Sequence, residues 1–122
     1  MTPFLEIHQA SASYPVYVGL ELLARVDELI RPKGKVFVIT SHELHARFGD
    51  VVRGADLVLI REGEKYKTLD TANEIVTQLL ERGAKRDSMA VVVGGGMIGD
   101  TAGFAASIFL RGIDLVHVPT TL

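Results

Sequence analysis

Apolar, β-branched runs alternate along this chain with segments whose apolar residues recur every three or four positions. Such runs are typical of strands that are buried on both faces of a sheet. Three of them follow one another, Lys35–Thr40, Asp56–Ile60 and Met89–Val93, and Ile113–Val118 is expected to form a fourth strand. The segments between them have helical spacing. This order predicts an α/β fold, a mostly parallel, Rossmann-like sheet with helices on both faces.

Capping residues delimit the helical segments. Ser41 is an expected N-cap, and Gly49 ends the short helix that follows it. Thr71 and Glu74 have the spacing of a capping box, and Gly83 is expected to end that helix. The predicted helices cover Leu20–Ile30, Ser41–Phe48, the stripe Leu69–Leu80, and Ile98–Leu110.

The first twenty residues predict a smaller feature. Phe4–His8 and Pro15–Val18 are expected to be short strands that pair as a hairpin at an edge of the sheet. The chain has 122 residues and no internal repeat or linker, so residues 1–122 are expected to form one domain.

Composition narrows the possible partners and location. The net charge is −2 and no basic stripe is present, which argues against nucleic acid binding. The chain contains no cysteine, so it has neither disulfides nor a thiolate metal site. The N-terminus does not resemble a signal peptide, and the apolar stretches are shorter than the ~20 residues that span a bilayer. We therefore expect a cytoplasmic protein with no membrane partner.

The glycine-rich segment Gly94–Gly99 carries the strongest chemical signal. It satisfies the pattern G-x-G-x-x-G between a predicted strand and a predicted helix. Glycines permit positive φ and lack Cβ atoms, so backbone N–H groups can approach a pyrophosphate at the positive end of the helix. However, the segment follows a late strand, and no acidic residue ends a strand about twenty positions later. The spacing alone indicates either a phosphorylated ligand or a tight turn required for packing.

A longer set of segments identifies a family. Gly94–Ala106, Leu110–Ile113 and Val118–Leu122, together with the loop Glu62–Leu69, closely resemble the signature of 3-dehydroquinate synthases. The resemblance is dense after Glu62 and loose before it.

This resemblance implies an enzyme of the shikimate pathway, which leads to aromatic amino acids. The enzyme uses NAD to convert 3-deoxy-arabino-heptulosonate 7-phosphate, a seven-carbon sugar acid phosphate, to 3-dehydroquinate with release of phosphate. The family implies a homodimer whose N-terminal α/β domain binds NAD and whose helical C-terminal domain carries zinc or cobalt. Residues 1–122 correspond to the NAD-binding domain. Counterparts of the metal ligands are absent from this sequence, so we expect the chain alone to be inactive.

The resemblance also implies a role for each matched residue. The pyrophosphate would be wrapped by Gly95, Gly96, Met97, Ile98 and Gly99. The adenosine half would be held by the loop residues Glu62, Gly63, Glu64, Lys65, Tyr66 and Lys67. Asp100 would accept hydrogen bonds from a ribose, and Thr120 and Thr121 would contact the cofactor. Arg111 would be a catalytic residue that reaches the substrate phosphate in the neighbouring subunit.

The chain departs from the family at the predicted adenosine site. Ser41 and His42 follow Thr40, where family members often carry Asp or Asn. His42 and His45 could mimic a metal-binding pair, but exposed helix residues explain them better. His117 replaces a common glutamine and is expected to be a packed neighbour.

Several residues and functions have alternative interpretations. Arg111 could simply complement a helix dipole, and Glu64 and Lys67 could be a solvated pair. The protein could be another sugar phosphate cyclase that makes an inosose or a valiolone. It could also be a catalytically inactive nucleotide-binding module. A metal-dependent polyol dehydrogenase fits less well, because such enzymes typically carry Lys or Ser where Met97 stands.

Overall fold

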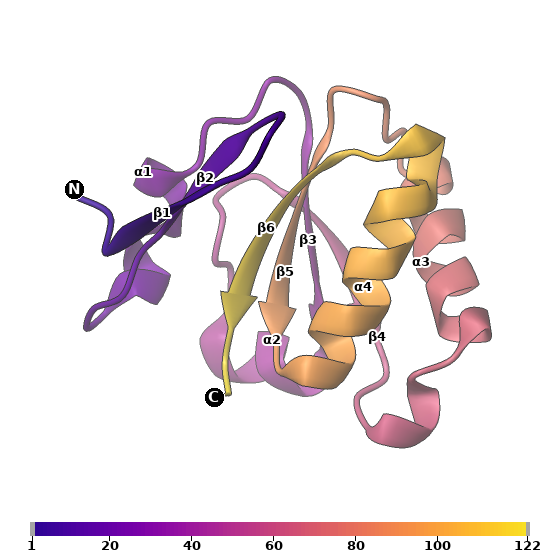
Figure 1. Ribbon diagram of the computed structural model, residues 1–122. Coiled ribbons are helices and arrows are strands. Elements are labelled where there is room, and N and C mark those ends of the chain that lie inside the picture. Colours follow the sequence, from indigo (N-terminus) through magenta and orange to yellow (C-terminus); the bar gives the residue numbers. More distant parts are fainter. Residues whose placement is uncertain (1, 122) are drawn as a thin grey trace.

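The computed structural model describes residues 2–121 and contains two sheets (Figure 1). The larger sheet has four parallel strands in the order β4-β3-β5-β6. These strands are β3 (Val36–Ser41), β4 (Asp56–Ile60), β5 (Met89–Gly94) and β6 (Asp114–Pro119). Helices connect them, which confirms the predicted α/β class and the four predicted strands. The last strand, β6, has exposed and partly buried residues only.

The two central strands, β3 and β5, are buried because both of their faces are covered. Every residue of β5 is buried. Phe37 and Ile39 contribute to one hydrophobic cluster, whereas Val38 between them contributes to a second cluster. This alternation follows the period of two in a strand, so the sheet separates two cores.

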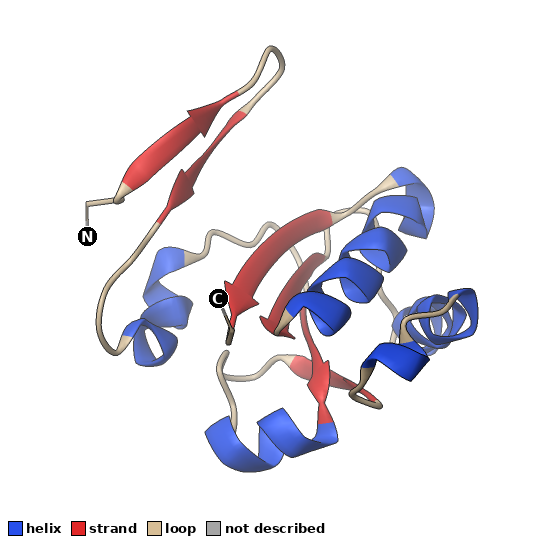
Figure 2. Cartoon of the chain, turned by 60° about the horizontal axis from the view of Figure 1, so that its bottom comes forward, coloured by secondary structure: helices blue, strands red, loops and turns tan. Residues whose placement is uncertain are grey.

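Helices α3 (Leu69–Glu81) and α4 (Gly96–Ile108) cover one face of the sheet (Figures 1 and 2). Ile75 and Leu79 of α3 are fully buried there. On α4 the buried residues include Ala102 and Ala105, whose small side chains allow close approach to the sheet. The α4 helix begins two residues earlier than the predicted Ile98, because the glycine turn itself enters the helix.

The opposite face is covered by a 3₁₀ turn, η1 (Leu22–Arg25), and a single α-turn, α1 (Val26–Leu29). The prediction of one continuous helix over Leu20–Ile30 is therefore wrong. Ile30 has extended dihedrals, φ −86° and ψ 156°. Pro32 disfavours helical geometry in the residue before it, and Ile30 is buried in the second cluster, so packing ends the helix early.

The N-terminal strands pair as predicted but do not join the parallel sheet. β1 (Leu5–His8) and β2 (Ser13–Val16) form a separate antiparallel hairpin. Figure 2 shows it projecting away from the rest of the chain. The expected position at an edge of the sheet is wrong. Most hairpin side chains are exposed, and Pro15 offers no backbone N–H for pairing.

Caps account for the remaining helix boundaries. Ser41 Oγ accepts a hydrogen bond from Leu44 N at 3.0 Å, as predicted for the start of α2 (His42–Phe48). The capping box at Thr71 is wrong: Thr68 is the N-cap of α3, and its Oγ1 accepts from Thr71 N at 3.2 Å. The helix begins earlier because Asp70 suits its first turn and Thr71 is buried.

The longest helices, α3 and α4, have 13 residues each. An α-helix that spans a bilayer needs ~20 residues. Within residues 2–121, no helix has the length and apolar character needed to cross a membrane.

Candidate functional site

The carboxyl ends of the parallel strands meet at one edge of the sheet, where the arrowheads of β5 and β6 lie in Figure 1. Open α/β sheets bind ligands at this edge. β5 ends at Gly94, and Gly95 is the N-cap of α4. The glycine turn therefore joins a central strand to a helix N-terminus, as the motif requires.

Close packing explains the first two glycines of the turn. A Cβ atom on Gly94 would lie 2.7 Å from Ile98 Cβ, and one on Gly95 would lie 2.8 Å from Thr121 Oγ1. None of the three glycines has a positive φ. The expectation of positive φ in this turn is therefore wrong: these residues must be small, and their backbone is ordinary.

Gly96 is different, because a Cβ atom there would meet nothing within 4 Å. It is exposed and is the first residue of α4. The N–H groups of a helix's first turn have no partner within the helix. Met97 and Ile98 bury their side chains in the core, so only their backbone is available to a ligand. Gly99 donates its N–H to Gly95 O at 2.9 Å and is committed to the helix.

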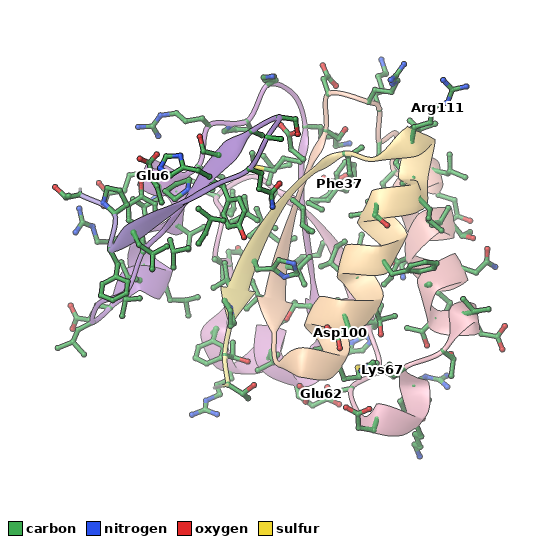
Figure 3. The ribbon with its side chains drawn as sticks, viewed as in Figure 1. Glu6, Phe37, Glu62, Lys67, Asp100 and Arg111 are labelled. Atoms are coloured by element: carbon green, nitrogen blue, oxygen red, sulfur yellow. The ribbon has the colours of Figure 1, made fainter. Side chains whose placement is uncertain are left out.

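An ion pair joins two segments that are separated by more than thirty positions in the sequence. Lys67 Nζ lies 2.8 Å from Asp100 Oδ2. The structure thus brings the predicted adenosine loop beside the N-terminal part of α4 (Figure 3). A hydrogen bond and the charge of Lys67 lower the pKa of Asp100, and the same contacts with Asp100 raise the pKa of Lys67. Both side chains are largely exposed, so the pair is accessible to a ligand.

The adenosine loop contains a short 3₁₀ turn, η2 (Glu64–Tyr66). Gly63 before it has φ 127°, a conformation that favours glycine. Tyr66 is partly buried against the first core cluster, whereas Glu64 and Lys65 are exposed. Glu62 is exposed as well. The tyrosine ring anchors the loop and leaves its charged residues in solvent.

Thr120 and Thr121 lie beside the glycine turn. Thr120 N donates to Gly94 O at 3.2 Å, and Thr121 stands over Gly95. A buried contact that was not predicted supports this edge: Thr40 Oγ1 donates to Val93 O at 2.7 Å. The only sequence signal for it was a threonine at the end of an apolar strand.

Arg111 lies at the opposite edge of the sheet from Asp100 and Lys67 (Figure 3). It ends the turn η3 (Phe109–Arg111), where Leu110 and Arg111 have positive φ of 46° and 69°. The arginine is exposed. Within one chain the structure does not bring Arg111 together with the other predicted site residues.

The histidines do not assemble a metal centre. Across residues 2–121, no group of three or more His, Asp or Glu side chains could hold a metal ion. His42 is exposed on α2, and His45 follows it by three positions. His117 faces α4, since a Cβ atom on Gly103 would lie 3.5 Å from its ring. Its charge contributes to the lowered pKa of Asp100, so it is a neighbour of the site.

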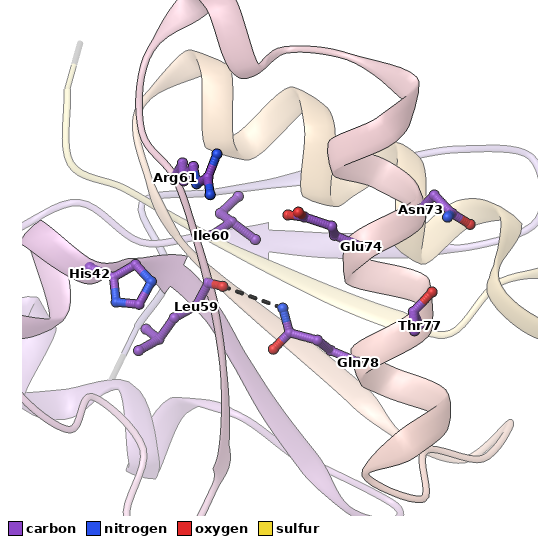
Figure 4. Close-up of a pocket in the computed structure, with 8 residues that line it drawn as sticks. All are labelled: His42, Leu59, Ile60, Arg61, Asn73, Glu74, Thr77 and Gln78. Atoms are coloured by element: carbon purple, nitrogen blue, oxygen red, sulfur yellow. Dashed lines mark hydrogen bonds between the residues drawn. The ribbon is translucent and has the colours of Figure 1, made fainter.

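An open cavity of about 380 Å³ lies near the end of β4 and against α3 (Figure 4). Gln78 Nε2 donates to Leu59 O there at 3.3 Å. The cavity was not predicted from the sequence, because its walls come from segments without a shared motif. The lining residues are His42, Leu59, Ile60, Arg61, Asn73, Glu74, Thr77 and Gln78.

The chain is similar in sequence to members of a known family. The family model described as 3-dehydroquinate synthase N-terminal matches residues 57–122. The 3-dehydroquinate synthase of Alkaliphilus metalliredigens is 39% identical over 97% of this chain. That of a Shewanella species is 35% identical over the whole chain. This chain spans about a third of the length of these relatives, 35% and 36% respectively.

Solved structures give the same relationship. A 2-deoxy-scyllo-inosose synthase complexed with carbaglucose-6-phosphate, NAD⁺ and Co²⁺ superposes with a TM-score of 0.77 and 30% identity. The match covers 95% of this chain and 35% of that protein. A 2-epi-5-epi-valiolone synthase from Streptomyces hygroscopicus, with NAD⁺ and Zn²⁺ bound, has the same TM-score at 24% identity and shares the fold. The chain belongs to the 3-dehydroquinate synthase family of sugar phosphate cyclases, whose N-terminal portion it matches.

Proposed function

We propose that the carboxyl edge of the sheet binds NAD⁺ and that residues 1–122 form the cofactor-binding domain of a 3-dehydroquinate synthase. One observation carries the proposal. Gly96 leaves open space at the N-terminus of α4, and the Lys67–Asp100 pair stands beside it. A pyrophosphate placed there would accept hydrogen bonds from the backbone N–H groups of Gly96, Met97 and Ile98.

Asp100 and Lys67 would contact different parts of the nucleotide. Asp100 is held as a carboxylate, because Lys67 lowers its pKa. A carboxylate only accepts hydrogen bonds, so it suits the hydroxyl groups of a ribose. Lys67, with Glu64 nearby, would contact the adenosine half or the pyrophosphate. Thr120 and Thr121 would contribute hydroxyls from the end of β6.

The proposed reaction belongs to the complete enzyme. When bound, the cofactor would supply reversible hydride transfer to and from the carbon that bears a hydroxyl of the sugar acid phosphate, and the ketone formed in between would acidify the neighbouring C–H and permit loss of phosphate. The residues of this chain would hold and orient the cofactor. Residues 2–121 contain no group of three side chains that could hold the metal ion of the family.

Arg111 would act in a second active site. It is exposed at the edge opposite to the nucleotide turn. A guanidinium there could reach the substrate phosphate only in a neighbouring subunit, which fits a homodimer. We propose this arrangement for the full-length, cytoplasmic enzyme of the shikimate pathway.

A second candidate is another sugar phosphate cyclase. The structural likeness to 2-deoxy-scyllo-inosose synthase, at 30% identity, favours it. We prefer 3-dehydroquinate synthase, because the curated relatives with that name reach 39% identity over nearly the whole chain.

Calorimetric titration with NAD⁺ tests the proposed cofactor site. The wild-type chain should bind NAD⁺, and Asp100→Ala should weaken binding by about tenfold, the effect of one lost charge-assisted hydrogen bond. Asp114→Ala is the matched control, because Asp114 is exposed at the start of β6, away from the carboxyl edge. Equal affinity of the wild type and Asp100→Ala would contradict the ribose contact. Absence of NAD⁺ binding by the wild type would contradict the proposal itself.

A further inference from the structure

The outer face of α4 presents apolar side chains between two opposite charges. Phe104 and Ile108 are 46% and 53% exposed, and they lie on one side of the helix because they are four positions apart. Asp100 is exposed one turn before Phe104. Arg111 is exposed in η3, at the other end of the helix (Figure 3).

The apolar surface extends from α4 onto the segments that follow it. Leu110 in η3 and Leu115 in β6 are both exposed. A Cβ atom on Gly103 would lie 3.8 Å from Leu115 Cδ2, so Leu115 lies against the helix. Single apolar side chains at a surface need no explanation, whereas a group of them on one face is typical of an interaction surface.

The charges at the two ends of this face favour a second copy of the same face as its partner. An α-helix rises by about 1.5 Å per residue, so Asp100 and Arg111 lie roughly 16 Å apart along the helix. When two copies of α4 pack antiparallel, the acidic end of each lies beside the basic end of the other. A parallel pair would bring like charges together at both ends. The face is therefore complementary to itself after a two-fold rotation.

The sizes of the exposed side chains indicate the register of such a pair. Ser107 is exposed on the same face, between Phe104 and Ile108, and its Oγ donates to Phe104 O at 2.7 Å. Its small side chain, with a hydroxyl already paired within the helix, allows the two helices to approach closely. A two-fold axis near this serine places Phe104 of each copy beside Ile108 of the other.

The ion pair within each chain is compatible with this arrangement. Lys67 contacts Asp100 through Oδ2, and a carboxylate can accept further hydrogen bonds through its other oxygen. In the antiparallel pair, Arg111 of one copy lies near Asp100 of the other. The guanidinium therefore approaches the N-terminal end of the partner's α4.

We propose that the outer face of α4 is a dimer interface, in which two copies of the chain pack antiparallel about a two-fold axis near Ser107. Each copy buries Phe104 and Ile108 against its partner, and the charges of Asp100 and Arg111 fix the direction of the helices. The inference rests on the proposed function in one respect, because it supplies the surface that would carry Arg111 to a second active site.

Disulfide cross-linking tests the proposed axis. The chain contains no cysteine, so an introduced thiol is unique. Ser107→Cys should form covalent dimers under mild oxidation at least about tenfold faster than a control variant, because the effective thiol concentration within a dimer is millimolar. Ser11→Cys is the matched control, since Ser11 is exposed in the hairpin that projects away from the sheet (Figure 2). Non-reducing electrophoresis measures both rates.

Sedimentation of the 122-residue chain tests the apolar contact. We expect a weak dimer of the wild type, with a dissociation constant of about 10–100 µM, because the face is small for a stable interface. Ile108→Glu should raise this constant at least about tenfold, since it buries a charge beside the partner's Phe104. Leu20→Glu is the control, because Leu20 is exposed just before η1, which covers the opposite face of the sheet.

The outcomes separate this inference from the proposed function. A wild type that stays monomeric at about 1 mM, a dimer that Ile108→Glu leaves intact, or equal cross-linking of the two cysteine variants would overturn the interface. Calorimetry with NAD⁺ reports on the cofactor site independently: a monomer that binds NAD⁺ loses only this inference, and a dimer that does not bind it contradicts the proposed function. Circular dichroism verifies folding, and Phe104→Ser provides a second reading if Ile108→Glu does not fold.

Discussion

The carboxyl and amino edges of the parallel sheet make tight turns in different ways. At the carboxyl edge, Gly94–Gly96 has no positive φ, and the glycines are needed because neighbouring side chains approach closely. At the amino edge, Leu110 and Arg111 adopt positive φ although neither is glycine. The first turn is sterically crowded but conformationally relaxed, and the second is conformationally strained.

This difference suggests what each edge is built for. A relaxed backbone at the start of α4 holds its N–H groups in fixed positions, which suits recognition of a pyrophosphate. Strain at a non-glycine residue persists only when surrounding contacts impose it. At the amino edge it holds Arg111 outward in solvent, consistent with the proposed contact to another subunit. Three substitutions test this comparison, and the largest effect is expected at the carboxyl edge.

Gly94→Ala should destabilise the fold by ~1–3 kcal/mol, the usual cost of overpacking a core. The new Cβ would lie 2.7 Å from Ile98 Cβ, which belongs to the buried start of α4 and has no space to move away. Urea denaturation followed by circular dichroism measures the loss.

Gly96→Ala is the matched control for this substitution. Its Cβ meets nothing within 4 Å, and alanine favours the helix, so stability should be unchanged or higher by up to ~1 kcal/mol. The added methyl group should nevertheless weaken NAD⁺ binding. Equal destabilisation by the two substitutions would show that crowding does not distinguish these glycines.

Arg111→Gly should increase stability by ~0.5–1 kcal/mol. Relief of a positive φ in a non-glycine residue exceeds the entropic cost of the new glycine. Arg82→Gly is the control, because Arg82 has a negative φ of −92° at the end of α3 and should lose stability. NAD⁺ affinity should not change in Arg111→Gly. A fall in stability would mean that contacts of the arginine outweigh the strain.

Lys67→Met should have the smallest effect, mainly on the titration of Asp100. Because Lys67 lowers the pKa of Asp100, the ion pair stabilises the fold at pH values above the ordinary pKa of aspartate. This stabilisation is lost as the pH falls through the lowered pKa of Asp100. At high pH the stabilisation by the ion pair is lost only when the pH rises through the raised pKa of Lys67, where the lysine loses its charge. Carboxyl chemical shifts should show a higher Asp100 midpoint in Lys67→Met, with Asp114 as the unaffected reference. An unchanged midpoint would mean that the pair is not populated in solution.

Most of the parallel sheet could be predicted from the sequence, because the residues of β3, β4 and β5 contribute to the cores on both faces. Such strands appear as continuous apolar runs, and β4 matched its predicted range, Asp56–Ile60. The segment Leu20–Ile30 and the hairpin were predicted less well. Their final geometry depends on long-range packing, such as burial of Ile30 against the sheet, which periodicity does not encode.

The candidate site also contains features that could be predicted from the sequence and features that could not. The glycine turn and the loop before α3 carry local motifs, so their residues could be named from the sequence. The Lys67–Asp100 contact and the adjacency of His42 and Arg61 depend on strand order and register. Neither property can be read from one segment alone.

The hydrogen bond from Gln78 to Leu59 O also affects how copies of the chain meet. β4 is an end strand of the sheet, and an unpaired strand edge is a template for edge-to-edge aggregation. The amide of Gln78 occupies the Leu59 carbonyl, and the ion pair of Asp56 with Lys35 places charge at the start of the same strand. A second strand that pairs with β4 must break the hydrogen bond between Gln78 and Leu59 O and remove water from the Lys35–Asp56 ion pair. We therefore expect β4 to be protected against amyloid-like pairing, whether or not a nucleotide is bound.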